Sequence, residues 1–148
     1  MVRLMVIASL SIAAFGAFGC QKYTTTLEQS PGRVDEGIAI STLRSIAAAQ
    51  TAFSVSNSGD YGSFEQLAGG SYLDERFNSG QPKIYGFVFT MSVSPRSSAT
   101  SEGSYQCNAD PDKAVNAAGR HFYISSSSVG VHVNATGPAT ANDENLQP

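Results

Sequence analysis

The chain has 148 residues and a mass of 15.5 kDa, which indicates one domain. Nine Lys and Arg residues against twelve Asp and Glu residues give a net charge of −3, which argues against a protein that binds duplex nucleic acid through a basic surface. Hydrophobic residues make up 41%, enough for a core, and two cysteines exclude a multi-disulfide framework or a four-cysteine zinc site.

The first 19 residues have the pattern of an export signal. Arg3 is the only charged residue before Lys22, and residues 4–19 form an uncharged, mostly apolar run. This run is shorter than the roughly 20 residues that a helix needs to cross a bilayer. A basic start, a short apolar stretch and small residues at its end predict a signal peptide over residues 1–19.

The signal ends in Ala17-Phe18-Gly19-Cys20. Small residues before a cysteine resemble the lipobox of bacterial lipoproteins, in which the thiol is diacylglycerated, the signal is cut before it and the new amine is acylated. The resemblance implies that Cys20 is the lipid attachment site. Ordinary signal cleavage is the alternative, because Ala17-x-Gly19 also fits the small-residue cleavage pattern.

The segment after the cysteine would be a lipidated tether. Residues 20–33 are mostly polar and contain Pro31-Gly32, which is typical of a linker. Gln21 resembles the residue found in lipoproteins that are sent to the outer membrane. We therefore expect an exported protein, held on the cell envelope by its N-terminal lipid, at the outer membrane or its periplasmic face.

A long amphipathic helix follows. Asp35 and Glu36 favour a helix start, residues 37–55 contain no proline, and residues 57–59 (Asn-Ser-Gly) supply the stop. The apolar residues that fall on one side of this helix are Ile38, Ala39, Leu43, Ile46 and Phe53. Ser63 and Gln66 have the spacing of a capping box, and residues 73–77 predict another helical turn.

Alternating patterns predict four strands in the second half. The first covers residues 84–93, where Tyr85, Phe87 and Phe89 share one face, and we assign these aromatics to the core rather than to a ligand platform. The other three strands are centred on Tyr105–Ala109, Phe122–Ile124 and Val129–Val133. Short connections between them imply an antiparallel meander, with its apolar face under the long helix.

The predicted fold class is therefore α+β: a long N-terminal amphipathic helix packed on a four-stranded antiparallel β-meander. The predicted domain covers residues 34–134. Residues 135–148 have little to bury, so we expect them to form a flexible C-terminal tail.

This order of elements is similar to the globular head of type IV pilins and of type II secretion pseudopilins. Tyr85-Gly86-Phe87, in the entry to the first strand, is one of the similar stretches. The stretches that carry the resemblance are 43–46, 49–53, 72–74, 80–89, 108–111, 119–123 and 133–139. The resemblance as a whole runs over about residues 36–147, and it implies a pilin-like head whose partners are pilus or secretion-system proteins.

The N-terminal segment departs from the pilin pattern. A pilin begins its mature chain with a long apolar helix that bears a glutamate near its start, anchors the subunit and packs in the fibre core. Here the tether and Cys20 occupy that place, Glu28 has polar neighbours, and no apolar run or prepilin-peptidase pattern is present. The sequence therefore implies a pilin-like head on a lipid rather than an ordinary fibre subunit.

The sequence offers few groups for catalysis. Cys107 falls on an apolar strand face, whereas His121 and His132 fall on polar faces, where we expect them to be exposed. A thiol and an imidazole on opposite faces cannot form a nucleophile–base pair. If Cys20 carries a lipid, we expect Cys107 to be a small buried residue; if it does not, a Cys20–Cys107 disulfide is the alternative.

One loop has the composition of a cation site. Asp110-x-Asp112, with Asn108 nearby, offers oxygen ligands, and some pseudopilins carry calcium in such a loop. The alternative is a solvated turn fixed by Pro111, and we assign no metal ligand, no cofactor and no catalytic residue. The sequence thus predicts a non-enzymatic structural or interaction module at the cell envelope, associated with pilus or type II secretion machinery. The second reading is a surface adhesin or ligand-binding module on the same scaffold.

Overall fold

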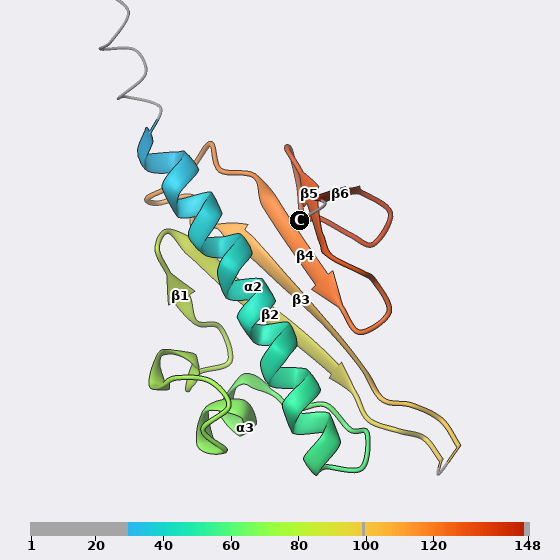
Figure 1. The fold of residues 1–148 in the computed structure, drawn as a ribbon. Helices are drawn as coiled ribbons and strands as arrows, with labels where there is room; N and C mark the ends of the chain where they lie inside the picture. The colour runs from blue at the N-terminus through green and yellow to red at the C-terminus, as the bar shows by residue number, and fades with distance from the viewer. Residues whose placement is uncertain (1–29, 99, 147–148) are drawn as a thin grey trace, which may run out of the picture.

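A computed structural model describes residues 30–98 and 100–146. The predicted signal peptide (1–19), the lipid attachment site Cys20 and the tether up to residue 29 lie outside the described residues. Figure 1 shows one long helix, α2, lying across one face of an antiparallel sheet, with the short helix α3 beside the lower end of α2. No helix among the described residues combines the length and the apolar character that crossing a membrane requires.

Helix α2 (Ser30–Ser56) buries a stripe of side chains at the spacing of an α-helix. The stripe comprises Ala39, Leu43, Ile46, Ala49 and Gln50. Its apolar members pack mainly against β4, and also against β3 and β5. The helix begins at Ser30, so the predicted boundary of the tether at residue 33 is wrong by a few residues.

The predicted helix stop at residues 57–59 is confirmed. Ser58 has a left-handed backbone (φ 58°), and the next residue, Gly59, also has a positive φ of 91°. The N–H of Gly59 donates to the carbonyl of Ser54 at 2.8 Å, the long-range bond of a Schellman-type C-cap.

A short helical region connects α2 to the sheet. Helix α3 (Phe64–Gly69) has the predicted capping box, in which Ser63 Oγ accepts from the Gln66 N–H and the Gln66 side chain accepts from the Ser63 N–H. The 3₁₀-helix η1 (Glu75–Phe77) follows. Buried Gln50 ties this region to α2, because its side chain donates to the Gly62 carbonyl at 2.7 Å and accepts from the Gly62 N–H at 3.0 Å.

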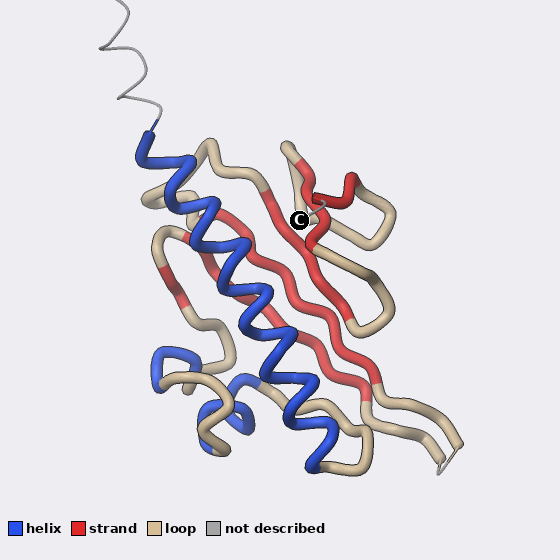
Figure 2. The backbone as a smooth tube through the Cα atoms, in the orientation of Figure 1, coloured by secondary structure: helices blue, strands red, loops and turns tan. Residues whose placement is uncertain are grey.

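The prediction of a four-stranded meander is wrong, because the sheet has six strands. All neighbours are antiparallel, and the strands follow one another in chain order. Their bounds are β1 (Lys83–Ile84), β2 (Phe87–Ser94), β3 (Ser104–Pro111), β4 (His121–Ser125), β5 (Val131–Asn134) and β6 (Glu144–Leu146). The α+β class with one long helix over the sheet remains, as the tube in Figure 2 shows.

One additional strand, β1, comes from a turn hidden inside the first predicted strand. Ile84 pairs with Phe87, so Tyr85 and Gly86 form a two-residue hairpin loop, with φ angles of 46° and 74°. Positive φ at both positions is typical of a type I′ turn. Tyr85 is therefore 58% exposed, which corrects its assignment to the core, whereas Phe87 and Phe89 are buried as predicted.

The other additional strand, β6, lies in the segment that was expected to be flexible. Residues 135–146 return along the sheet, β6 pairs with β5, and Ala139 is buried. Polar contacts hold this return: the Asp143 carboxylate accepts from the Thr140 N–H at 2.7 Å and from the Asn134 side-chain amide at 2.8 Å. The prediction of a flexible tail is thus wrong for these residues.

An ion pair joins the start of the helix layer to the sheet layer. The Arg120 guanidinium donates to Glu36 Oε2 at 2.8 Å, and the Arg120 N–H donates to Glu36 Oε1 at 3.1 Å. Burial by itself would raise the pKa of Glu36, but the hydrogen bonds and the charge of Arg120 outweigh it, so this pKa lies below its usual value.

Candidate functional site

The face of the sheet turned away from α2 carries polar side chains in rows across the strands. Alternate residues of β2 and β3 point to this outer face, because Phe89, Cys107 and their alternating neighbours point to the core. Strand register then places Ser92 opposite Gln106, and Gln106 opposite Ser125. A neighbouring row places Thr90 opposite Asn108 and Asn108 opposite Tyr123.

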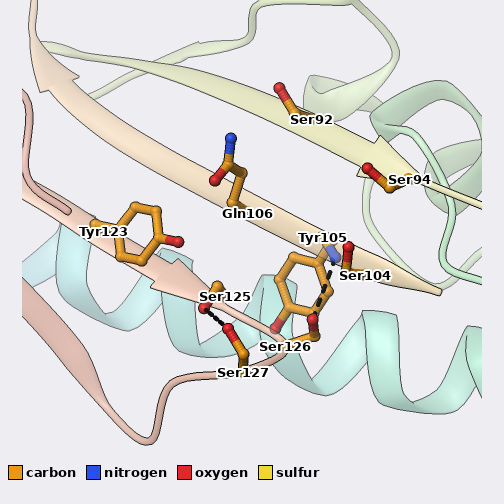
Figure 3. Close-up of a pocket in the computed structure, with 9 residues that line it drawn as sticks. All are labelled: Ser92, Ser94, Ser104, Tyr105, Gln106, Tyr123, Ser125, Ser126 and Ser127. Carbon is orange, nitrogen blue, oxygen red and sulfur yellow. Dashed lines mark hydrogen bonds between the residues drawn. The ribbon is translucent and has the colours of Figure 1, made fainter. Parts of the chain in front are cut away.

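These rows border a shallow pocket of about 180 Å³, which we call the serine groove. Six of its lining residues are serines: Ser92, Ser94, Ser104, Ser125, Ser126 and Ser127. The other three are Tyr105, Gln106 and Tyr123, and Figure 3 shows all nine around the hollow. The groove contains no acidic, basic or histidine side chain, so it offers hydrogen bonds and no counter-ion.

Three hydroxyls at one end of the groove, those of Ser125, Ser126 and Ser127, are already engaged by the protein. Ser125 Oγ lies 3.2 Å from Ser127 Oγ and 2.9 Å from Ser128 Oγ. Ser126 Oγ accepts from the Tyr105 N–H at 3.3 Å. These contacts fix the turn after β4, and they leave each serine with spare hydrogen-bonding capacity, since a hydroxyl has one donor and two acceptor positions.

Tyr123 is buried as a whole residue, like Ser125 and unlike the other serines of the groove. It is only 8% exposed, and its ring packs edge-on against His132, with 6.1 Å between ring centroids. Its hydroxyl makes no hydrogen bond to any described residue, and Figure 3 shows it pointing towards the middle of the groove. The residue as a whole is buried, but its hydroxyl is open to solvent, so Tyr123 presents an available polar group at this site.

The structure gives the residues of the candidate cation loop separate partners. Asp110 bonds to His121 Nδ1 at 2.6 Å, while Asp112 bonds to the Lys83 ammonium at 3.0 Å, a contact that lowers the pKa of Asp112. The Asn108 side chain donates to the carbonyl of Ala139 at 2.8 Å. Among the residues that the structure describes, no group of three His, Cys, Asp or Glu side chains is placed to hold a metal ion.

The two histidines are less exposed than the sequence predicts. His132 is 7% exposed, with Nδ1 2.9 Å from the carbonyl of Asp143, and its Nε2 is buried without a partner among the described residues. His121 is largely buried beside Asp110. The expectation of exposed histidines is wrong. It assumed that solvent reaches the outer face of β4 and β5, but residues 135–143 cover part of that face.

Cys107 lies apart from both histidines. It is fully buried on the face under α2, whereas His121 lies with Asp110 on the opposite face. Burial, together with the nearby charge of Asp110, raises the pKa of the thiol well above its usual value. A buried neutral thiol is a packing group, as the sequence predicts for a chain in which Cys20 carries a lipid.

The serine groove was not predicted as a site. Its sequence signal is the alternation: the positions between the apolar residues at this end of β2 and β3 are uncharged and polar, namely Ser92, Ser94, Ser104 and Gln106. Tyr123 gave no such signal, because its burial depends on which residues cover it.

Comparison with known proteins finds no family model, no characterised protein and no solved structure that matches this chain. The class that the structure defines is an α+β module, with one long helix over a consecutive antiparallel sheet and an uncharged polar groove on the outer face. The resemblance to pilins and pseudopilins stays a prediction from the sequence.

Proposed function

We propose that this chain is an exported lipoprotein whose pilin-like head is a non-enzymatic interaction module at the cell envelope. The observation that carries the proposal is the layout of the chain: a signal-like run ending at Cys20 precedes a long helix that packs across an antiparallel sheet. About ten residues separate Cys20 from Ser30, and a segment of that length reaches at most roughly 35 Å. A lipid on Cys20 would therefore keep the head close to the bilayer.

The proposed role is attachment to a partner rather than polymerisation. Type IV pilins assemble through a long apolar stalk, and residues 20–33 of this chain are too polar to form one. We expect the head to bind pilus or type II secretion proteins at the envelope. Chemical crosslinking in cells followed by purification of this chain tests the expectation, and recovery without any such component would contradict it.

The anchor is tested by cell fractionation with mass analysis of the mature N-terminus. We expect the mature chain to begin at Cys20, to carry acyl chains and to be labelled by radioactive palmitate. Cys20→Ser should release the protein from membranes, because two or more acyl chains are needed for stable attachment. Cys107→Ser is the matched control, and it should stay membrane-bound. An unmodified N-terminus, or a Cys20→Ser variant that remains in membranes, would refute the anchor.

A second candidate function is a surface adhesin or ligand-binding module on the same scaffold. The serine groove favours it, because this groove combines a hollow with polar groups that keep spare hydrogen-bonding capacity. Binding at the groove is compatible with the lipid anchor, and the two are tested separately.

A further inference from the structure

We propose that the serine groove binds a neutral saccharide, an inference that rests on the second candidate function, ligand binding by the outer face. The first argument is charge. None of the nine lining residues is acidic, basic or a histidine, so the groove has no guanidinium or ammonium for a phosphate or carboxylate and no carboxylate for an amine. A charged ligand would lose its hydration there without gaining an ion pair.

The second argument is the match between hydrogen-bonding groups. A serine hydroxyl both donates and accepts, and the amide of Gln106 supplies two donors and an acceptor. Sugar hydroxyls also both donate and accept, so one saccharide ring can form hydrogen bonds with several groove residues, as donor to some and as acceptor from others. An extended peptide, by contrast, is bound through a sheet edge rather than across a sheet face.

The third argument is Tyr123. Its ring is packed against His132 beneath the surface, which leaves no open aromatic face for stacking, but its hydroxyl reaches the groove without a protein partner. The hydroxyl is open to solvent, so a ligand group can replace water there, and it favours a ligand that carries hydrogen-bonding groups.

The dimensions of the groove limit the ligand to one or two sugar units. Ser92, Gln106 and Ser125 form a row across three strands, which lie about 4.8 Å apart. The hollow of about 180 Å³ is smaller than the ~300–1,000 Å³ of pockets for drug-sized ligands. We therefore expect weak binding, with a Kd on the order of 1 mM.

The test is nuclear magnetic resonance titration of the ¹⁵N-labelled full chain carrying Cys20→Ser, which cannot be acylated. The probes are maltose, cellobiose, lactose and N,N′-diacetylchitobiose, with glucose 6-phosphate as the charged comparison. We expect at least one disaccharide to shift the amide resonances of Ser92, Gln106 and Ser125, and glucose 6-phosphate to leave them unchanged. The inference is refuted if none of the four disaccharides shifts them, if the shifts map elsewhere, or if only the charged sugar binds.

Two variants separate a specific site from a merely polar surface. Tyr123→Phe removes one hydroxyl and keeps the buried ring, and Gln106→Ala changes an exposed residue on which no described hydrogen bond depends. Each should weaken binding by about threefold to tenfold, the effect of one lost hydrogen bond. Tyr85→Phe, in the exposed turn before β2, is the matched control and should bind as the parent does.

Binding unchanged in both Tyr123→Phe and Gln106→Ala would overturn the inference. Gln106→Ala decides the question if Tyr123→Phe fails to fold. These results are independent of the envelope proposal, because Cys20→Ser removes the anchor without altering the groove. If the chain is lipidated but the groove binds no saccharide, only this inference is refuted. If the groove binds a saccharide but the chain carries no lipid, only the anchor is refuted.

Discussion

Glu36 and Arg120 make the clearest single contact between the two layers of the molecule. The residues are 84 positions apart in the chain, and Arg120 engages both carboxylate oxygens through its guanidinium and its backbone N–H. The guanidinium also lies 5.7 Å from the centre of the Phe122 ring. The Glu36 side chain is 14% exposed, so solvent screens this pair less than it screens an ordinary surface pair.

Glu36→Gln should lower the free energy of unfolding by about 1 kcal/mol at pH 7, because it removes the charge from three hydrogen bonds. The pKa of Glu36 is lowered in the folded state from 4.5, so its stabilisation is fully present above pH 4.5 and is lost as the pH falls through the folded pKa. Urea unfolding of parent and variant at pH 7 and pH 3 measures the difference, which should shrink at the lower pH.

Glu75→Gln is the control for this prediction. Glu75 is an exposed carboxylate in η1, and its substitution should change the unfolding free energy by less than about 0.5 kcal/mol. If Glu36→Gln loses as much stability at pH 3 as at pH 7, the stabilisation does not come from the ionised carboxylate.

At the scale of elements, the β1–β2 hairpin contains a residue in an unfavourable conformation. Tyr85 has a φ of 46° and an exposed ring, and the conformation is costly for a bulky side chain. Asn-Gly is the preferred pair in a type I′ turn, and Gly86 already occupies the second position.

Tyr85→Asn should therefore raise the free energy of unfolding by about 0.5–1 kcal/mol. Chemical unfolding of the full chain carrying Cys20→Ser measures it. Tyr85→Ala is the control, because it removes the same ring while keeping a residue that disfavours positive φ, and it should not stabilise. Equal gains in both variants would mean that removing the ring, and not the turn conformation, is responsible.

At the scale of the whole molecule, helix and sheet together seal Cys107 from solvent. The thiol is fully buried, and burial raises its pKa, so it should be protected in the native state. A Cys20–Cys107 disulfide would require this core position to open, which favours the alternative in which Cys107 stays unpaired.

In the Cys20→Ser chain, a thiol reagent such as dithionitrobenzoate should therefore detect no reactive thiol under native conditions and one after unfolding in urea. The labelling rate at low urea should follow the opening of the core. Labelling at the rate of a free thiol under native conditions would contradict the packing of α2 over β3.

The sequence by itself determined the elements whose signals are local. The apolar stripe of α2, its stop at Gly59, the capping box at Ser63 and the alternation through Cys107 follow from periodicity and backbone preference, which need no knowledge of distant residues. The sequence also placed uncharged polar residues at outer positions of β2 and β3, and Ser92, Ser94, Ser104 and Gln106 later line the serine groove.

Only the tertiary structure decided the number of strands and the existence of the site. A two-residue turn at Tyr85 and Gly86 preserves the alternation of a continuous strand, so the pattern could not reveal it. β6 is held by its pairing with β5 and by the hydrogen bond between Asp143 and Asn134. These contacts leave no apolar pattern in the sequence from which the strand could be predicted. Residues 135–143 cover part of the outer face. Tyr123 and His132 are buried because segments that are distant in the chain fold together. Local sequence preferences do not encode such contacts.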